Sequence, residues 1–275
     1  MGSYGFYKCV NMIGEHPTWT LNILTNLSYS PDRLLASRLA KEKRLFITAS
    51  WHPLGTSDRT KAWSNFKKNL LKLKKAEVPV QVMYLWHKPQ IKWFPEYFRW
   101  LDSHDFRVNI RRRLKRSSIF TVMFRKLFPK RFSGKFKLEN YTPLERQCLY
   151  AFNNPKTLKY SLGLHSTYGM ECTAGKDMIL VEHDGTVRLC ADCTNCLGNI
   201  FDKNYTLNAD CIKCPTNTCG GHYGMLHLKD KEFGELPEQL WNDTFVSQVE
   251  GLKQSSPVAY RNREEILMLM KHLKY

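Results

Sequence analysis

Residues 172–219 read CTAGKDMILVEHDGTVRLCADCTNCLGNIFDKNYTLNADCIKCPTNTC and hold seven of the nine cysteines of the chain. Thiolates separated by two residues can bind one metal ion, because a tight turn brings both sulfurs to the same side. Three such spacings occur in this stretch, so it is predicted to bind metal. The seven cysteines are Cys172, Cys190, Cys193, Cys196, Cys211, Cys214 and Cys219.

A β-hairpin is predicted between the first two of these cysteines. The apolar run 178–182 and the β-prone run 186–189 flank an Asp-Gly pair, a pattern typical of two antiparallel strands joined by a turn. Cys172 would stand just before the first strand and Cys190 at the end of the second. Because the two ends of a hairpin lie close together, both thiols are expected to serve one site.

Three kinds of cysteine chemistry are compatible with these spacings. A disulfide framework suits secreted chains of fewer than about 100 residues, whereas this chain has 275 residues and an odd number of cysteines. Structural zinc fits Cys193-x2-Cys196-x14-Cys211-x2-Cys214, which is an acceptable zinc-ribbon spacing. Iron–sulfur clusters also take four thiolates. Spacing alone does not separate zinc from an iron–sulfur cluster.

The order of the cysteines resembles the C-terminal extension of radical S-adenosylmethionine enzymes, which is called SPASM or, in its shorter form, twitch. The matching pattern is Cys172, twelve residues, Gly185, four residues and Cys190, followed after a gap by Cys211-x2-Cys214. In the shorter form of the family, cysteines at these four positions hold one auxiliary [4Fe–4S] cluster. The resemblance therefore implies such a cluster in this chain.

Three further cysteines and one histidine are additional candidate ligands. Cys193 and Cys196 lie outside the family pattern and are candidate substitutes for a family ligand, whereas Cys219 belongs to the longer form. That longer form has a further cysteine where Tyr223 stands here, so a complete second cluster of the family type is not expected. His222 is either a ligand in place of a missing cysteine or an exposed loop histidine.

The composition is that of a folded and strongly basic protein. Hydrophobic residues make up 43% of the chain, and 42 Lys and Arg against 25 Asp and Glu give a formal net charge of +17. Such a charge suits nucleic acid, an anionic membrane surface or an acidic substrate. The apolar runs are shorter than the ~18 residues of a transmembrane segment. Numerous free thiols without a targeting segment favour a reducing cytoplasm.

Ahead of the cysteines, β-prone apolar segments alternate with amphipathic helical segments. That order is typical of parallel βαβ units, so this part of the chain is predicted to be α/β with parallel strands. A helix ending at Gly14 is expected before the first strand. The expected strands cover residues 19–26, 45–50, 78–86 and 106–110, and the helices between them are one that starts at Ser30 and two over 57–75 and 93–103.

This alternation resembles the second half of the partial (β/α) barrel of radical S-adenosylmethionine enzymes. Thr25 and Asn26 end one expected strand and Ser50 ends the next. The resemblance implies that these side chains face the ligand side of the sheet and bind S-adenosylmethionine. Ordinary strand-end capping explains the same residue types equally well.

One defining element of the family is missing. Its Cys-x3-Cys-x2-Cys loop, whose thiolates leave one iron open for S-adenosylmethionine, has no counterpart in these 275 residues. The chain therefore corresponds to an N-terminally truncated relative, which retains only the auxiliary cluster. We expect that it does not cleave S-adenosylmethionine by itself.

Residues 111–137 are the most basic stretch and contain a phenylalanine every four residues between positions 120 and 136. A basic amphipathic segment of this kind suits an anionic membrane surface or a nucleic acid. It is equally compatible with an insertion that packs its phenylalanines on the barrel. Just beyond it, Thr142 and Glu145 have the spacing of a capping box, which predicts a helix to about residue 152.

Three regions follow from these patterns: a partial barrel over 1–155, a SPASM- or twitch-like cysteine-rich domain over 156–235, and C-terminal helices over 236–275. By resemblance, the chain is an iron–sulfur protein whose relatives generate a 5′-deoxyadenosyl radical to modify a peptide or a small metabolite. One alternative is a zinc-ribbon module that binds nucleic acid, which the charge favours. Another is a non-catalytic adaptor that uses the cysteine-rich domain as a partner-binding surface.

Overall fold

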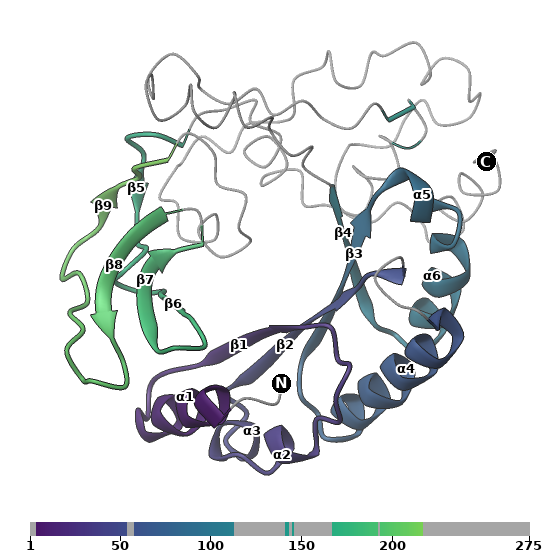
Figure 1. Cartoon of the computed structure of the whole chain (residues 1–275), viewed down its shortest axis with the longest axis horizontal. Helices are drawn as coiled ribbons and strands as arrows, with labels where there is room; N and C mark the ends of the chain where they lie inside the picture. The colour runs from purple at the N-terminus through teal and green to yellow at the C-terminus, as the bar shows by residue number, and fades with distance from the viewer. Residues whose placement is uncertain are drawn as a thin grey trace. The chain divides into compact units, whose positions relative to one another are not determined.

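The computed structural model of the chain describes residues 4–53, 58–112, 141–142, 145, 167–191 and 193–216. These residues belong to two compact units, the first built mainly from residues 4–112 and the second mainly from residues 167–216 (Figure 1). Within the described ranges, no helix is both long enough and apolar enough to cross a bilayer.

A parallel four-stranded sheet is the centre of the first unit, which is therefore mixed α/β, as the alternating pattern predicts. Within the described residues the strands lie side by side in chain order, each hydrogen-bonded in parallel to the next. Parallel neighbours require crossover connections, and helices supply them. The strands are β1 Leu21–Thr25, β2 Leu45–Trp51, β3 Val80–Trp86 and β4 Arg107–Arg112.

The expected helices are present, with two differences, one of which is the short helix α5 (Lys88–Ile91), which was not predicted. A single helix was expected from Ser30, but the chain forms two short ones. The break is at Ser37, whose hydroxyl caps the second helix by accepting a hydrogen bond from the Ala40 N–H at 3.3 Å, as Ser does at helix starts. The helices are α1 Tyr4–Glu15, α2 Asp32–Leu35, α3 Arg38–Lys41, α4 Arg59–Lys75, α5 Lys88–Ile91 and α6 Phe94–Ser103.

All four strands are where they were expected, with boundaries that differ by one or two residues. β3 begins at Val80 rather than at Val78, because the intervening Pro79 has no N–H to donate to the ladder. β4 continues to Arg112, and its Arg111 is in register with Leu85 of β3. The first two arginines of the basic stretch therefore belong to the sheet.

The core of the first unit is aromatic and lies between the sheet and two helices. The ring of Trp51 in β2 lies 5.1 Å from those of Trp63 and Phe66 in α4, and 5.4 Å from that of Tyr97 in α6. Burial of a large apolar side chain contributes about 1.5–3 kcal/mol, so this cluster anchors both helices on the sheet. The inward positions predicted for α4 are all buried: Trp63, Phe66, Leu70 and Leu73.

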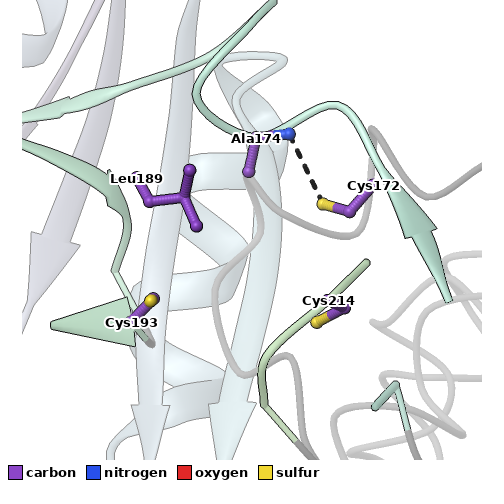
Figure 2. Close-up of a cluster of buried hydrophobic side chains, with 5 residues drawn as sticks. All are labelled: Cys172, Ala174, Leu189, Cys193 and Cys214. Carbon is purple, nitrogen blue, oxygen red and sulfur yellow. Dashed lines mark hydrogen bonds between the residues drawn. The ribbon is translucent and has the colours of Figure 1, made fainter. Parts of the chain in front are cut away.

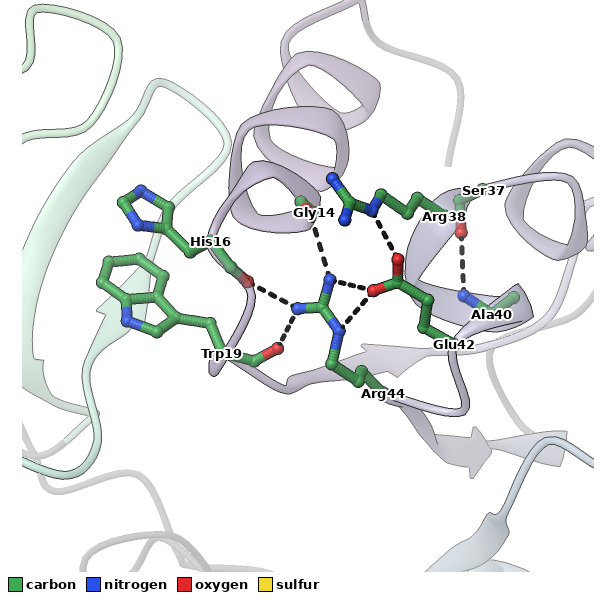
Figure 3. A network of polar contacts seen from close by, with 8 residues as sticks. All are labelled: Gly14, His16, Trp19, Ser37, Arg38, Ala40, Glu42 and Arg44. Atoms are coloured by element: carbon green, nitrogen blue, oxygen red, sulfur yellow. Dashed lines mark hydrogen bonds and ion pairs between the residues drawn. The ribbon is translucent and has the colours of Figure 1, made fainter.

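Arg44 joins the end of α1 to the start of β2 (Figure 3). Its guanidinium donates hydrogen bonds to the backbone carbonyls of Gly14, His16 and Trp19, with lengths of 3.0 Å to Gly14 and 2.6 Å to His16. The last carbonyls of a helix have no partner inside the helix. Arg44 supplies one, and it also forms an ion pair with Glu42.

The second unit contains two small antiparallel sheets. β6 and β7 pair around Asp184 and Gly185, where the hairpin turn was expected. Gly185 has a φ of 84°, a left-handed conformation that the second residue of an Asp-Gly turn adopts without strain. One sheet is β5 Glu171–Cys172 with β9 Ile212–Lys213, and the other is β6 Leu180–Val181, β7 Thr186–Cys190 and β8 Cys193–Asn199.

The predicted capping box is confirmed. The Thr142 N–H donates to Glu145 Oε2 at 2.7 Å, and the Glu145 N–H donates to Thr142 Oγ1 at 3.2 Å. Several predictions fall outside the described residues: the course of the following helix to residue 152, the basic stretch beyond Arg112, the ligand candidates Cys219 and His222, and the helices expected in 236–275.

Candidate metal centre

Three cysteines from separate segments meet in one buried cluster of the second unit (Figure 2). Cys172 is 5% exposed, and Cys193 and Cys214 are each 7% exposed. Ala174 and Leu189 complete the buried set, and Cys190 packs against it. The six cysteines of residues 172–216 are all free thiols, so the described part of the chain contains no disulfide framework.

The pairing of β5 with β9 places Cys172 and Cys214 together. Cys172 is in register with Ile212, and the Cys214 N–H donates to the carbonyl of Met170 at 2.8 Å. Side chains alternate between the two faces of a strand, so Cys172 and Cys214 lie on the same face as Ile212 and Met170. The packing agrees, because Ile212 and Met170 both contact the buried cluster.

Cys190 and Cys193 stand at facing ends of β7 and β8. They are direct register partners across the two-residue connection between these strands, so their side chains start from the same side of the ladder. A register shift lies between Arg188 and Cys190. Such a bulge interrupts the strict alternation of side chains, and both Leu189 and Cys190 reach the cluster.

Gly175 brings the segment after Cys172 against β7. Its φ is 83°, and a Cβ at this position would lie 2.5 Å from Leu189 Cδ1 and 2.5 Å from Asn208 Nδ2. Asn208 holds the same segment by two hydrogen bonds, from its N–H to the Gly175 carbonyl at 2.9 Å and from its amide to the Ala174 carbonyl at 3.3 Å. Glycine is required here because a side chain would separate Cys172 from Leu189.

Backbone N–H groups point at two of the buried sulfurs. The Ala174 N–H donates to Cys172 Sγ at 3.4 Å, and the Asn195 N–H donates to Cys193 Sγ at 3.5 Å. Each donor is two residues beyond its cysteine, as in a turn around a metal ligand. Hydrogen bonds to sulfur stabilise the thiolate and adjust the electronic properties of metal–thiolate centres. The hydroxyl of Thr216 lies 3.4 Å from Cys214 Sγ.

The protonation state of Cys172 reflects its surroundings. Burial raises the pKa of this thiol, the Ala174 N–H lowers it, and the nearby thiols of Cys214 and Cys211 raise it. Without a bound cation, Cys172 is therefore a neutral thiol near pH 7. Because the ligand of a metal is the thiolate, metal uptake here releases a proton.

The other two predicted ligands within the described residues, Cys196 and Cys211, lie outside the buried cluster. Cys196 is exposed and its Sγ–H donates to the Gly198 carbonyl at 3.5 Å. Cys211 is half-buried and lies just before β9. Among the residues that the structure describes, no three His, Cys, Asp or Glu side chains are close enough to hold a metal ion. The choice of ligands thus stays a prediction.

The predicted cofactor residues at the strand ends make local hydrogen bonds. Thr25 Oγ1 accepts from the Leu27 N–H and Asn26 Oδ1 accepts from the Ser28 N–H, both at 3.1 Å, which is the strand-end capping alternative. Ser50 is buried in β2. The register pairs Thr25 with Ala49, so Thr25 and Ser50 lie on opposite faces of the sheet. Binding of S-adenosylmethionine by these three residues stays a prediction.

Two features of the site were not anticipated. The sequence did not show that Cys193 belongs to the buried cluster, although the Cys190-x2-Cys193 spacing showed that these two cysteines are neighbours. The N–H donors after Cys172 and Cys193 depend on backbone conformation, for which the sequence holds no signal beyond the glycine at position 175.

Comparisons with known proteins produced structural matches alone. No protein-family model matches the chain, and no curated protein matches it. The similar solved structures include native anSMEcpe with bound AdoMet and Cp18Cys peptide (20% identity, TM-score 0.40, covering 67% of this chain and 55% of that chain). They also include native anSMEcpe with bound AdoMet and Kp18Cys peptide (16% identity, TM-score 0.41, with the same coverage).

The protein in these structures is an anaerobic sulfatase-maturating enzyme of the AdoMet radical class. A polyhistidine-tagged form with bound AdoMet matches at 17% identity and a TM-score of 0.37, covering 66% of this chain and 52% of that chain. The present chain thus spans about half the length of the structures that it matches. Similarity at these values does not establish its family, and no site residue is assigned from it.

Proposed function

We propose that the chain is an iron–sulfur protein of the radical S-adenosylmethionine class, in which the cysteine-rich segment holds an auxiliary [4Fe–4S] cluster. The observation that supports this proposal is the buried meeting of Cys172, Cys193 and Cys214, with Cys190 against them. Thiolates are the ligands that iron–sulfur clusters take.

The surroundings of these thiols fit a buried metal–thiolate centre. Leu189 and Ala174 exclude water from it, and the N–H groups of Ala174 and Asn195 supply hydrogen bonds to sulfur. When bound, the cluster would accept or pass an electron or help to seat the substrate. The thiols would hold the cluster among apolar side chains, and the two N–H donors would adjust its reduction potential.

The proposed substrate is a peptide or a small metabolite, as in the family that the sequence resembles, and the proposed compartment is a reducing cytoplasm. The parallel sheet is the element on which such a substrate and S-adenosylmethionine would bind, at the ends of β1 and β2. The anionic or nucleic-acid partner suggested by the net charge depends on residues 113–137, which lie outside the described ranges.

Zinc is the second candidate for the same site. Its support is that Cys193 and Cys214, two members of the zinc-ribbon spacing, are buried in one cluster. Cys196, which the zinc-ribbon spacing needs and the family pattern does not use, fits less well because it is exposed. A structural zinc site requires all four thiolates around one ion, so the iron–sulfur proposal is preferred.

The test is anaerobic purification of the full chain, followed by a visible spectrum and analysis of iron, sulfide and zinc. We expect a brown protein with iron and sulfide in equal amounts, and loss of both in Cys172→Ser and Cys214→Ser. The control is Cys9→Ala, which changes a buried cysteine of the first unit and should leave the metal content unchanged. A colourless protein with stoichiometric zinc would instead support the second candidate.

A further inference from the structure

We infer that one face of the four-stranded sheet binds an acidic peptide, which Arg107, Asn109 and Arg111 of β4 recognise. The proposal deepens the proposed function and rests on it, because it names the chemical class of the peptide substrate and the residues that bind it. The face is the one opposite to the packing of α4 and α6. Its residues belong to the first unit, and none of them is a cysteine.

The two faces of the sheet have different neighbours. On one face, the ring of Trp51 lies 5.4 Å from that of Tyr97, and the ring of Tyr84 lies 4.8 Å from that of Phe94, both partners being in α6. Figure 1 shows α4 and α6 on the same side of the strands. Side chains alternate along a strand, so the residues next to Trp51 and Tyr84 within β2 and β3 lie on the opposite face. We call that opposite face the polar face.

Three residues of β4 form a line on the polar face. Arg107, Asn109 and Arg111 occupy alternate positions along this strand. Val108 and Ile110 between them are buried, with 6% and 0% exposure, as expected of the helix-covered face. The register of β3 with β4 agrees, because it pairs residues of the polar face with one another. These pairs are Gln81 with Arg107, Met83 with Asn109 and Leu85 with Arg111.

The polar face is unusual for a parallel sheet. Such sheets are normally buried on both faces and consist of nearly continuous apolar strands. Here β2 contributes two buried hydroxyl residues, Thr48 at 4% exposure and Ser50 at 8%. The Thr48 hydroxyl donates to Asn22 Oδ1 at 3.1 Å. A face of this composition is poorly suited to packing against an apolar helix and well suited to hydrogen bonds with a polar ligand.

Asn109 supplies an acceptor that lacks a partner. Its Oδ1 is buried, and within the part of the chain that the structure describes it accepts no hydrogen bond. An unsatisfied buried acceptor destabilises a folded protein, and the few that native structures contain call for an explanation. The backbone N–H groups of an extended peptide are donors of the kind that this oxygen requires. A bound peptide would therefore satisfy it.

The charge of the polar face selects for an anion. The segments that form β1 to β4 contain no aspartate or glutamate. Arg107 is exposed and Arg111 is partly buried, and a guanidinium binds a carboxylate through two parallel hydrogen bonds. The chain as a whole carries a net charge of +17, which attracts anionic partners. An acidic peptide therefore complements this face.

The spacing of the two arginines defines the peptide further. Arg107 and Arg111 are four residues apart in one strand, so their Cα atoms are separated by about 13 Å, at roughly 3.3 Å per residue. Two residues four positions apart in another extended chain have the same separation. A peptide lying along β4 would thus place two acidic side chains at the arginines and the backbone between them near Asn109.

The opposing explanation is that the polar face is an ordinary solvated surface. Its arginines would then attract anions only through the net charge, as would any other exposed basic residue of this unit. Lys88 in α5 and Arg99 in α6 are exposed residues of that kind. Removing two positive charges at either place therefore distinguishes a binding site from an effect of net charge.

The experiment measures binding of a fluorescein-labelled peptide by fluorescence anisotropy. The probe carries two glutamates four residues apart, and its counterpart carries glutamine at both places. We expect the glutamate peptide to bind at least about tenfold more tightly, because hydrogen bonds between charged groups are the stronger ones. Arg107→Gln combined with Arg111→Gln should abolish this preference. Lys88→Gln combined with Arg99→Gln is the matched control and should retain it.

Asn109→Leu provides a readout that an ordinary surface residue would not give. It removes the unsatisfied acceptor, so we expect the melting temperature of the free chain to rise by roughly 2–4 °C. The affinity for the glutamate peptide should fall by about fivefold, because one hydrogen bond is lost. A gain in stability together with a loss of binding is typical of a residue retained for a ligand. Circular dichroism shows whether each variant is folded.

Several outcomes would overturn the inference. Equal affinity for the two peptides, or an equal loss in the control variant, would leave only net charge. Unchanged affinity in Asn109→Leu would remove Asn109 from the site. S-adenosylmethionine also carries a carboxylate, so displacement of the peptide by this cofactor would assign the arginines to the cofactor instead.

Failure of this inference is distinguishable from failure of the proposed function. Peptide binding is measured on the full chain as purified, and iron and sulfide are measured on the same sample. A brown chain that does not prefer the glutamate peptide retains the proposed function and loses this inference. A colourless chain that prefers the glutamate peptide loses the iron–sulfur proposal and retains the peptide site.

Discussion

The guanidinium of Arg44 stabilises the junction between α1 and β2 through three backbone carbonyls. Its side chain is only 12% exposed, so water has little access to these carbonyls. We predict that Arg44→Ala lowers the free energy of unfolding by about 1–3 kcal/mol, because hydrogen bonds from a charged donor are lost and the acceptors stay buried. Thermal unfolding followed by tryptophan fluorescence measures this loss.

The matched control for that change is Arg38→Ala. Arg38 forms an ion pair with the same Glu42, but its side chain is 61% exposed, and pairs between exposed charges contribute little. Its removal should therefore lower the melting temperature much less than Arg44→Ala. Equal effects of the two substitutions would show that the carbonyl contacts of Arg44 add nothing to stability.

The element that depends most on a single backbone position is β8. Gly198 has a φ of 127°, and a Cβ there would lie 2.3 Å from the carbonyl oxygen of Asn204 and 2.6 Å from the Cα of Tyr205. The close approach lets the Thr206 N–H donate to the Leu197 carbonyl at 3.0 Å. The segment after β8 is thereby held along the strand.

We predict that Gly198→Ala destabilises the three-stranded sheet by more than about 2 kcal/mol, because the backbone would have to move away from Asn204. Hydrogen exchange measured by mass spectrometry should show faster exchange of amides in β7 and β8, with no change in α4. Gly169→Ala is the control, since Gly169 has a φ of 79° but a Cβ added there would meet nothing within 4 Å. Similar exchange in both variants would contradict the role given to the close approach.

Across the whole chain, the arrangement of cysteines limits which reaction is expected. Cleavage of S-adenosylmethionine needs an iron with a free position for the cofactor, and the family provides it with a Cys-x3-Cys-x2-Cys loop that is absent from these 275 residues. A centre held by four thiolates is closed in the way that structural four-cysteine sites are closed. The proposed auxiliary cluster therefore does not replace the missing loop.

We predict that the reconstituted chain, incubated anaerobically with dithionite and S-adenosylmethionine, forms no 5′-deoxyadenosine above the level of the same mixture without protein. Liquid chromatography of the products measures this. A radical S-adenosylmethionine enzyme with an intact loop, assayed in parallel, shows that the conditions support cleavage. Repeated turnover by the present chain would contradict the prediction.

Much of the fold followed from local patterns. The alternation of apolar strands with amphipathic helices predicted four parallel strands, and all four are present in the described residues, where the structure places them in chain order. The spacing of Trp63, Phe66, Leu70 and Leu73 predicted the buried face of α4. These features depend on the residue period of a helix or a strand, which is local and therefore visible in the sequence. The division between α2 and α3 was missed because one capping hydroxyl outweighed the helical pattern.

The sequence alone also showed that residues 172–219 are rich in thiols and have spacings suited to binding a metal. Which thiols meet is a different kind of property, and only the tertiary structure decided it. The approach of Cys172 to Cys214 follows from the register of β5 with β9, and the approach of Cys193 to Cys190 follows from the pairing of β7 with β8. A shift of one residue in either pairing would move each thiol to the opposite face. Register is set by contacts between distant parts of the chain, so cysteine spacing could not reveal it.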